Sequence, residues 1–416
     1  MSHGLTVTFS PPSRIGEREF VLMVAMLQAM QALAIDAMLP ALGDIALDLH
    51  AAHANDRQFI IGGFLVGSGL GSLVPGVLSD RYGRRPVLFA CLGAYCLLNL
   101  ACALATSMTM LIALRVITGF FTSGMTVLPA AMIRDRFEGD RMARLQSLVS
   151  MIFLLVPALA PSLGQAVLLF AGWRWVFGIM AIMSAGLLLW CALRLSESVT
   201  AENRQMISVS AIFNNMREIV TTRESIGYVL ALSAASTMFF NFLSTAQQLI
   251  GEHFGAGRLF PLFFAFLAGS MIIASLTNAR LVMRFGARRV SHTALLSFIV
   301  VGAVQAFFAF GPHQTLIQFA LLTALTLGLT AFITANFTAI ALQPFGRTAG
   351  AASSVLAFLR MVIGAVGGLI IGSMYDGSAR PLALTIVGAG LFALAFVIWS
   401  ERGRLFRRLH YPPLQG

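Results

Sequence analysis

Continuous apolar runs dominate this sequence and restrict what it can fold into. The 416-residue chain is 58% hydrophobic and only 11% charged. Runs of about 18 or more mostly apolar residues recur along it, and each is long enough to cross a bilayer as a helix of ~20 residues. The runs are continuous rather than alternating, which argues against a membrane β-barrel. The sequence therefore predicts an all-α polytopic membrane protein.

The apolar runs predict twelve transmembrane helices, six on each side of the longest polar interruption. The predicted spans are 19–40, 58–78, 87–105, 109–131, 144–168, 174–194, 224–249, 259–280, 291–311, 315–341, 349–373 and 380–399. We therefore expect two pseudo-symmetric six-helix halves joined by a linker that contains a short surface helix around 208–220. The predicted divisions are a tail at 1–18, an N-terminal half at 19–194, a linker at 195–223, a C-terminal half at 224–399 and a tail at 400–416.

The distribution of basic residues predicts the orientation of the chain in its membrane. The 28 basic residues are all arginines, and the net charge is +11. If the first helix starts inside, 22 arginines fall in inside segments and 4 in outside loops. This asymmetry follows the positive-inside rule, so both termini should be cytoplasmic. The positive charge therefore orients a multi-pass inner-membrane protein, and we expect no nucleic-acid partner.

A short arginine-rich turn joins the second and third spans, and a weaker copy of it occurs in the second half. The first copy runs from Gly76 to Pro86 and contains Asp80, Arg81, Gly83, Arg84 and Arg85. An offset of 203 residues places Gly83 on Gly286 and Arg81 on Arg284, and it places Arg115 on Gln318. Two repeated halves are typical of transporters, whose substrate site lies near the bilayer midplane between them. The simpler alternative is that the turn is only a charged anchor.

Once residues at the rims of the spans are set aside, three ionisable residues remain as functional candidates, because charge in the membrane is costly: Asp36, Arg115 and Arg360. Asp36 shares one helix face with Gln28 and Gln31. Burial disfavours the charged form of a carboxylate, which suits a group that loads and releases protons. The alternative is a structural carboxylate tied to an arginine or to the backbone.

The two arginines within spans have different candidate roles. Arg115 stays protonated, so it must pair, bind an anion or repel cations. A purely structural role is its alternative. Arg360 lies about eleven residues into its span, roughly 16 Å deep at ~1.5 Å per residue, too far to reach the cytoplasmic side easily. We expect it to contact substrate or, alternatively, to bond to a carbonyl or to Asp36.

Several spans carry residues suited to bending, packing or binding. Pro157, Pro161 and Gly164 predict a kinked, closely packed fifth span, and Gly364 and Gly367 predict a similar surface in the eleventh. Aromatic rings alternate with amides in the seventh span, which suits flat amphipathic ligands, although lipid contact or packing is the commoner role. The cavity candidates are Phe239, Asn241 and Phe242 from the seventh span, and Gln318 and Asn336 from the tenth.

No enzyme constellation is present in the sequence. It has no lysine, so a phosphate-binding loop of the G-x-x-x-x-G-K-[ST] type is excluded. The four cysteines and seven histidines have no metal-ligand spacing. We therefore expect no enzymatic activity, no metal and no cofactor.

The turn from Gly76 to Pro86 resembles the G-x-x-x-D-R-x-G-R-R/K loop that marks the major facilitator superfamily. Over nearly the whole chain the sequence is most similar to the bicyclomycin/chloramphenicol-type drug:proton antiporters. The similarity is also carried by Asp36 to Pro40, Arg115 to Gly119, and Pro157 to Gly164. The last segment fits an A-P-x-x-A-P-x-x-G pattern, except that Val156 replaces the first alanine.

The resemblance implies drug export by alternating access, driven by proton entry. It implies that Asp36 titrates and that Arg115 tunes its pKa. It also implies that a conformational latch is formed by Gly76, Asp80, Arg81, Gly83, Arg84 and Arg85, with the Asp80 carboxylate near a neighbouring helix N-terminus. With Arg115 and Arg360 both facing the cavity, an ionised Asp36 would leave one net positive charge. We therefore expect neutral or weakly anionic substrates.

Three other functions are compatible with the sequence. The chain could be a uniporter or symporter of a metabolite such as a sugar or amino acid. It could export an endogenous product such as a siderophore, or it could be a non-transporting receptor. In each transport case the expected partners are a small molecule, protons and the lipid bilayer, and the expected state is a monomer.

Overall fold

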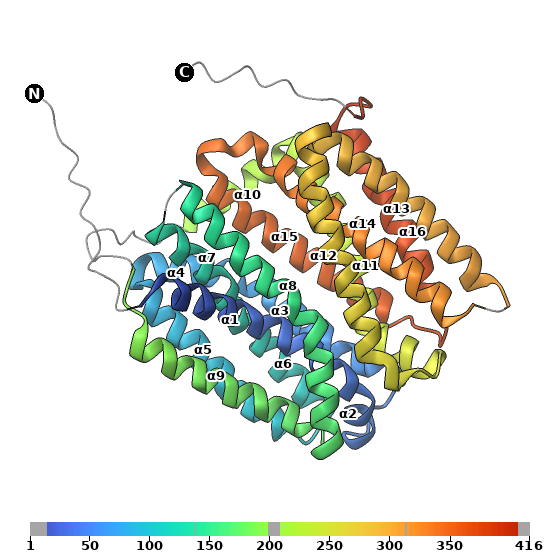
Figure 1. Cartoon of the computed structure of the whole chain (residues 1–416), viewed down its shortest axis with the longest axis horizontal. Helices are drawn as coiled ribbons and strands as arrows, with labels where there is room; N and C mark the ends of the chain where they lie inside the picture. The colour runs from blue at the N-terminus through green and yellow to red at the C-terminus, as the bar shows by residue number, and fades with distance from the viewer. Residues whose placement is uncertain (1–14, 138, 199–208, 313, 407–416) are drawn as a thin grey trace, which may run out of the picture.

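The structure is a computed structural model that describes residues 15–137, 139–198, 209–312 and 314–406. The described part of the chain is helical and contains no strand. Its helices form two bundles side by side, the first in blue and green and the second in yellow and red (Figure 1). The helices of the first bundle are α1 (Glu17–Asp36), α2 (Leu42–Asp48), α3 (Gln58–Gly71), α4 (Val74–Tyr82), α5 (Arg84–Ala103), α6 (Met108–Thr122), α7 (Gly124–Arg136), α8 (Gly139–Phe170) and α9 (Arg174–Arg194).

The second bundle follows a short amphipathic helix. This helix, α10 (Val209–Thr221), lies within the predicted linker, at the position expected for its surface helix. The helices that follow are α11 (Arg223–Gln247), α12 (Phe260–Phe285), α13 (Ala287–Phe310), α14 (Leu316–Leu342), α15 (Ala349–Gly372) and α16 (Arg380–Ser400). We call the end of the molecule that carries α10 the linker end, and the opposite end the Arg57 end.

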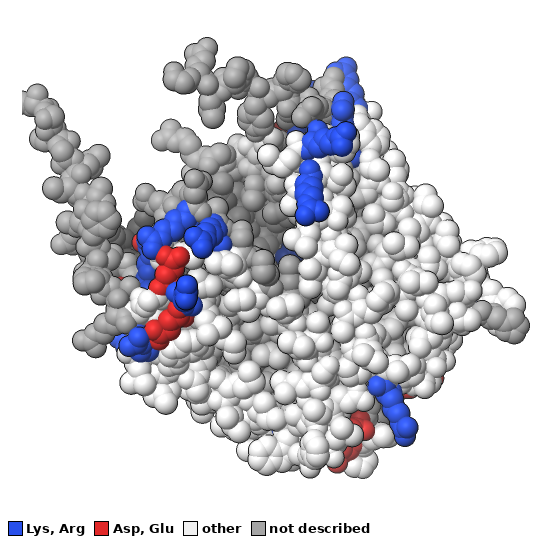
Figure 2. All heavy atoms as spheres, in the orientation of Figure 1, with Lys and Arg blue, Asp and Glu red and all other residues white. Residues whose placement is uncertain are grey.

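The apolar helices confirm a polytopic membrane protein. In the described residues, ten helices are long and apolar enough to cross a membrane, and α3 with α4 forms a further span bent by 42°. A shorter apolar helix, Leu155–Phe170, lies within α8. Together these occupy the twelve predicted positions. Figure 2 shows an uncharged surface across the middle of this face, with charged side chains gathered toward the ends, as a bilayer requires.

Proline residues explain two of the helix breaks. α1 ends at Asp36, and the chain continues through a 3₁₀ turn, Leu39–Ala41, that contains Pro40. Pro75 lies in the first turn of α4, directly after the break that follows α3. Proline cannot donate a backbone hydrogen bond, so it fits the first turn of a helix better than the interior of one. The first break places Asp36 at a helix end within the membrane rather than in the middle of a continuous helix.

The two arginine-rich turns have the same backbone geometry. Gly83 separates α4 from α5 with φ 101°, and Gly286 separates α12 from α13 with φ 86°. These positive φ angles lie in a region that side chains with a Cβ atom rarely adopt, which explains glycine at both positions. The offset of 203 residues found in the sequence therefore joins structurally equivalent turns.

Glycine residues allow α3 and α6 to pack with their backbones almost in contact. A Cβ atom on Gly67 would lie 1.9 Å from the carbonyl oxygen of Val116, and one on Gly119 would lie 2.0 Å from that of Phe64. Small residues of this kind bring membrane helices together because helix association in lipid depends on van der Waals contact. The close approach holds α6, and with it Arg115, against α3.

We expect Gly67→Ala to destabilise the protein because α3 and α6 would have to separate to accept the added methyl group. Overpacking of this kind costs about 1–3 kcal/mol. The matched control is Gly93→Ala in α5, where an added Cβ atom meets nothing within 4 Å. Thermal unfolding of the purified protein in detergent measures both. Equal unfolding midpoints for the two variants would show that the contact does not limit stability.

Candidate functional site

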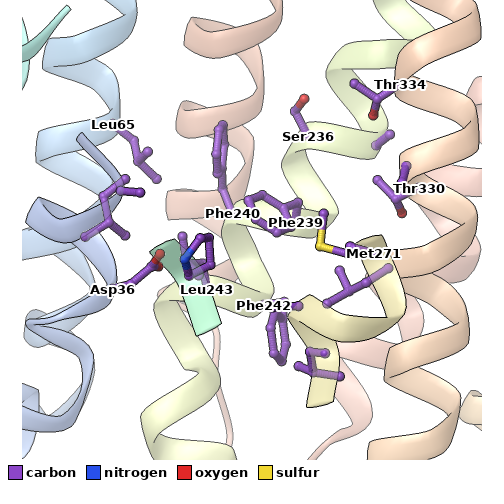
Figure 3. Close-up of a pocket in the computed structure, with 18 of the residues that line it drawn as sticks. Asp36, Leu65, Ser236, Phe239, Phe240, Phe242, Leu243, Met271, Thr330 and Thr334 are labelled. Carbon is purple, nitrogen blue, oxygen red and sulfur yellow. The ribbon is translucent and has the colours of Figure 1, made fainter. Parts of the chain in front are cut away.

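A cavity of about 530 Å³ lies between the two halves. Helices α1, α3 and α8 line it from the N-terminal half, and α11, α12, α14 and α15 line it from the C-terminal half (Figure 3). Its lining is mostly apolar, and the side chains with polar groups are Gln31, Asp36, Ser236, Thr330, Thr334 and Arg360. A concave, mostly apolar site with a few polar groups is typical of small-molecule binding.

Asp36 brings a carboxylate to the edge of this cavity. It is the last residue of α1 and is 5% exposed. Figure 3 shows its carboxyl group directed toward the space in front of the α11 phenylalanines. Within the described residues it accepts no hydrogen bond and has no ion-pair partner within 4 Å. The structural alternative, a carboxylate tied to an arginine, is therefore not what the geometry shows.

Arg360 supplies the cavity's opposite charge. It lies on α15, on the C-terminal side of the cavity. In the part of the chain that the structure describes, its guanidinium has neither an ion-pair partner nor a hydrogen bond, so the expected bond to Asp36 or to a carbonyl is not formed. A half-buried guanidinium without a partner is poorly solvated, which makes it available to a ligand with an acceptor group.

Arg115 lies outside the cavity, which corrects the predicted charge of the site. It is 0% exposed and donates from Nη2 to the carbonyl oxygen of Ala34 at 2.8 Å. Its guanidinium also lies 4.2 Å from the ring centre of Phe64. Because α1 ends at Asp36, the Ala34 carbonyl lacks a partner in the next helical turn, and a cation at a helix C-terminus is favourable. The expected net positive charge therefore does not arise: ionised Asp36 and Arg360 balance.

Phenylalanines from α11 form much of the apolar wall. Phe239 and Phe242, both predicted, line the cavity together with Phe240. Phe242 also stacks on Phe264 of α12, with ring centres 6.0 Å apart and an angle of 22° between the rings. Aromatic faces of this kind accept flat or amphipathic molecules without specifying one hydrogen-bond pattern.

Some predicted residues have other partners. Gln31 lines the cavity and donates to Ser68 at 3.0 Å, which ties α1 to α3, whereas Gln28 is not among the lining residues.

Asn241 is buried and donates to Thr385 at 3.2 Å. Asn336 is buried and donates to Asn278 at 2.7 Å. Their amides hold helices of the C-terminal half together, so their expected place in the cavity lining is corrected.

Gln318 is the clearest correction among the predicted cavity residues. It forms a capping box with Thr315 at the N-terminus of α14, where its side chain accepts from the Thr315 backbone at 3.0 Å. The repeat offset aligned it with Arg115, but the first turn of a helix needs its free N–H groups satisfied, and Gln318 does this. It therefore lies far along α14 from the cavity residues Thr330 and Thr334.

The polar contribution of α14 to the cavity was not predicted from the sequence. Thr330 and Thr334 line the cavity on the C-terminal side and stand one turn apart in Figure 3. With Thr326 they form a stripe at i, i+4 and i+8 on an otherwise apolar helix. That periodic hydroxyl stripe is the signal that would have found them.

The two-proline helix packs directly against the segment after Asp36. Pro157 lines the cavity, and a Cβ atom on Gly164 would lie 1.9 Å from the carbonyl oxygen of Ala37. Gly164 is therefore the residue that lets α8 approach the break in α1. On α15, added Cβ atoms at Gly364 and Gly367 would lie 2.7 Å from atoms of Ser236 and Thr237, respectively. Both groups of glycines thus position the helices that line the cavity.

The predicted latch residues form a charged cluster at the linker end. Arg84 pairs with Asp80 at 2.6 Å and with Asp135 of α7 at 2.9 Å. The carboxylate of Glu197 accepts from the backbone N–H groups of Arg84 at 2.9 Å and Arg85 at 3.1 Å. At the N-terminus of α5, the carboxylate is therefore that of Glu197 rather than Asp80, because the chain after α9 returns to this turn.

The remaining latch residues have less extensive contacts. Arg81 is exposed, and its guanidinium lies 5.3 Å from the ring centre of Tyr82. Arg85 donates from Nη2 to the carbonyl oxygen of Ala192 at 2.8 Å, which ties the turn to α9. Gly76 lies within α4, where an added Cβ atom would only touch Val127 at 3.5 Å.

Polar contacts between the halves are concentrated at the Arg57 end. Arg57, 5% exposed, donates to both carboxylate oxygens of Glu252, at 2.6 and 3.0 Å, and to Gln247 at 2.8 Å. Gln58 donates to Gln248 at 2.8 Å. Asn55 accepts from Gln248 and donates to the carbonyl oxygens of Ser373 and Tyr375. Among the described residues, these are the hydrogen bonds that join the two halves, so the cavity is closed at this end.

A family model for the Major Facilitator Superfamily matches residues 24–368. The chain belongs to the Major Facilitator Superfamily. It is therefore a multi-pass membrane transporter of small molecules and not an enzyme.

Individual relatives extend over nearly the whole chain. The Uncharacterized MFS-type transporter YdgK of Bacillus subtilis (strain 168) is 30% identical over 383 residues, covering 90% of this chain and 93% of the relative. A bicyclomycin resistance protein homolog of Haemophilus influenzae is 27% identical over 374 residues, covering 88% and 92%. Among solved structures, a bacterial homolog to the human lysosomal transporter Spinster matches with a TM-score of 0.74 at 14% identity, covering 95% and 97%, which shows the fold.

We expect Glu252→Gln to weaken the closure at the Arg57 end because it removes the ion pair but keeps the shape of the side chain. A hydrogen bond to a charged group contributes about 1.5–3 kcal/mol, so the closed form should lose roughly tenfold or more in population relative to the open form. Spin labels at the exposed positions His53 and Leu259 would report longer distances across this end.

Asp44→Asn is the control for this experiment, because Asp44 is an exposed acid at the same end that joins no contact between the halves. Its distance distribution should match that of the unsubstituted protein. A Glu252→Gln distribution that also matches it would show that the ion pair does not hold the halves together.

Proposed function

We propose that this transporter exports small amphipathic, neutral or weakly anionic molecules, drugs among them, in exchange for protons by alternating access. The observation that carries the proposal is the pair of charges in the cavity. Asp36 and Arg360 are both without partners among the described residues, and they share an otherwise aromatic and aliphatic wall.

A proton on Asp36 would change the charge that a substrate meets. With Asp36 ionised, the two cavity charges balance, and a neutral molecule meets no net field. With Asp36 protonated, Arg360 leaves the cavity positive, and a bound cation is penalised in the low dielectric. This charge balance disfavours cations as substrates, and we propose that proton loading and substrate binding alternate because both use the cavity edge at Asp36.

The break in α1 links this charge to the movement of the halves. Asp36 stands at the helix end, Arg115 binds the Ala34 carbonyl just before it, and Gly164 of α8 packs on Ala37 just after it. Discontinuous helices at the site between two halves are a feature of transporters that rock around a fixed binding site. We propose that Arg115 is a positioning residue that holds the end of α1, and so Asp36, in place.

The closed Arg57 end supports a state in which the cavity communicates with the linker end. If the arginine-rich linker end is cytoplasmic, as the positive-inside distribution indicates, this is the inward-facing state. We propose that the cluster of Asp80, Arg84 and Glu197 closes or releases that end. The proposal includes a monomer in the inner membrane with both termini cytoplasmic, a proton gradient as driving force and no cofactor.

The cavity favours amphipathic substrates over sugars. A sugar is bound by many hydrogen bonds, whereas this lining offers few polar side chains among its aromatic and aliphatic residues. The name of the Haemophilus influenzae relative points the same way, because it refers to resistance to bicyclomycin. An amphipathic endogenous product fits the same lining, so the assay below includes siderophore-like compounds.

We expect Asp36→Asn to abolish substrate-triggered proton movement, because asparagine cannot take up or release a proton at this position. The measurement uses purified protein in liposomes with a pH-sensitive dye trapped inside and an imposed proton gradient. Chloramphenicol-like, siderophore-like and quaternary ammonium compounds are added in turn. Asp44→Asn is the control and should retain full coupling.

Two outcomes would contradict this proposal. Transport that ignores the gradient and is unchanged in Asp36→Asn would mean facilitated diffusion, with Asp36 in a structural role. Robust Asp36-dependent export of a quaternary ammonium compound would leave antiport in place but reject the proposed substrate class.

We expect Arg360→Gln to separate substrates by charge. Loss of the guanidinium removes the attraction for an anionic group and leaves the aromatic wall intact, so the apparent affinity for weakly anionic substrates should fall at least tenfold, while that for neutral substrates should change little. Competition of labelled neutral substrate by neutral and by weakly anionic analogues measures the difference. An equal loss for both classes would instead assign Arg360 a structural role.

A further inference from the structure

A second concave site lies on the C-terminal half, away from the cavity between the halves. It is a groove of about 450 Å³ between α12, α13 and α14 at the linker end. Its walls are mostly apolar, and Phe406, beyond α16, borders it. The groove residues used below are Leu281, Phe285, Arg289, Thr293, Ser297 and Leu329.

The groove has a defined end because Phe406 is held in place. The Phe406 backbone N–H donates to Nδ1 of His292 at 3.0 Å, and its carbonyl oxygen accepts from Nε of Arg289 at 3.1 Å. The ring also packs edge-on against His292, with ring centres 5.6 Å apart. The groove is therefore bordered by fixed side chains from three helices and from the segment that follows α16.

Positive charge surrounds this end of the groove without acidic partners. Arg289 lines it, and Arg284 lies on α12 at i+3 from the lining residue Leu281. Arg280 and Arg284 are like charges at i and i+4, and within the described residues neither has an ion pair. The acid near this turn, Glu401, is already paired with Arg288 at 2.6 Å. Figure 2 shows blue side chains over this end of α12 with no red neighbour on that face.

Two hydroxyl groups lie deeper in the groove, on the same face of α13 as Arg289. Thr293 and Ser297 follow Arg289 at i+4 and i+8 on α13, roughly 6 and 12 Å deeper at ~1.5 Å per residue. In the described part of the structure neither hydroxyl makes a hydrogen bond, whereas Ser291 on the same helix donates to the carbonyl oxygen of Ala287. Polar groups facing lipid without a partner are unfavourable, so a ligand with polar atoms at this depth would satisfy them.

We propose that this groove binds an anionic glycerophospholipid. The phosphate would lie against Arg289 and Arg284, the ester oxygens would accept from Thr293, and an acyl chain would lie along Leu281, Phe285 and Leu329. Basic pockets between transmembrane helices at the cytoplasmic side suit anionic head groups, and charge and apolar length together select a lipid over a free anion. The site is separate from the transported substrate and does not depend on the proposed transport cycle.

The test uses the full chain purified in a non-ionic detergent, with native mass spectrometry and thermal unfolding in the presence of dioleoylphosphatidylglycerol or dioleoylphosphatidylcholine. We expect the anionic lipid to be retained more tightly and to raise the unfolding midpoint more. The double variant Arg284→Gln with Arg289→Gln should lose roughly 25-fold in apparent affinity, since each basic side chain near an anionic surface contributes about fivefold. Arg134→Gln, at an exposed arginine of the same end on α7, is the control and should retain the effect.

Further variants and ligands separate a groove from general surface charge. Leu329→Trp fills the groove without changing its charge, and it should weaken retention of the anionic lipid. Glycerol phosphate, which carries the anion without acyl chains, should not reproduce the stabilisation. Equal retention of the two lipids, equal losses in the double variant and in Arg134→Gln, or full stabilisation by glycerol phosphate would each overturn the proposal.

Discussion

The hydrogen bond from Arg115 to the carbonyl oxygen of Ala34 is the interaction on which the rest of the site depends. Breaking a helix inside a membrane leaves carbonyl groups without partners, and lipid cannot satisfy them. In this protein α1 stops at Asp36, and a fully buried guanidinium from α6 binds the carbonyl group exposed by that stop. Arg115 can reach it because glycines bring α3 and α6 almost into backbone contact. In our proposal, this contact holds the carboxylate of Asp36 at the cavity edge.

The polar contacts at the two ends of the molecule differ in which parts of the chain they join. At the Arg57 end, a buried arginine and a set of amides join the halves, so this end is closed. At the linker end, Arg84 binds Asp80 and Asp135 within the N-terminal half, and Arg288 binds Glu401 within the C-terminal half. The halves are thus tied to each other at one end and tied internally at the other, which is the arrangement that a rocking movement needs.

The sequence predicted the helices well and the cavity only in part. Apolar runs, the polar interruption after Arg194 and the repeated glycine turn are local patterns, and the structure has a helix at every predicted span. Asp36, Gln31, Phe239, Phe242 and Arg360 were expected in the cavity and line it. Asn241, Asn336 and Gln318 were expected there too, but their amides are used between helices or at a helix cap. The sequence shows that a membrane helix carries an amide side chain, but it does not show whether that amide bonds to another helix, to a helix cap or to a ligand.

The sequence by itself determined that the chain spans a membrane, where its helices lie and that its two halves repeat, because helix length and hydrophobic pattern depend only on neighbouring residues. It also singled out the three charges inside the membrane. Only the tertiary structure decided which groups those charges contact. Arg115 and Arg360 are both arginines deep in apolar spans, yet one binds a carbonyl group at a helix end and the other faces the cavity. That difference arises from which helix faces meet, a property of packing between distant segments that no local pattern contains.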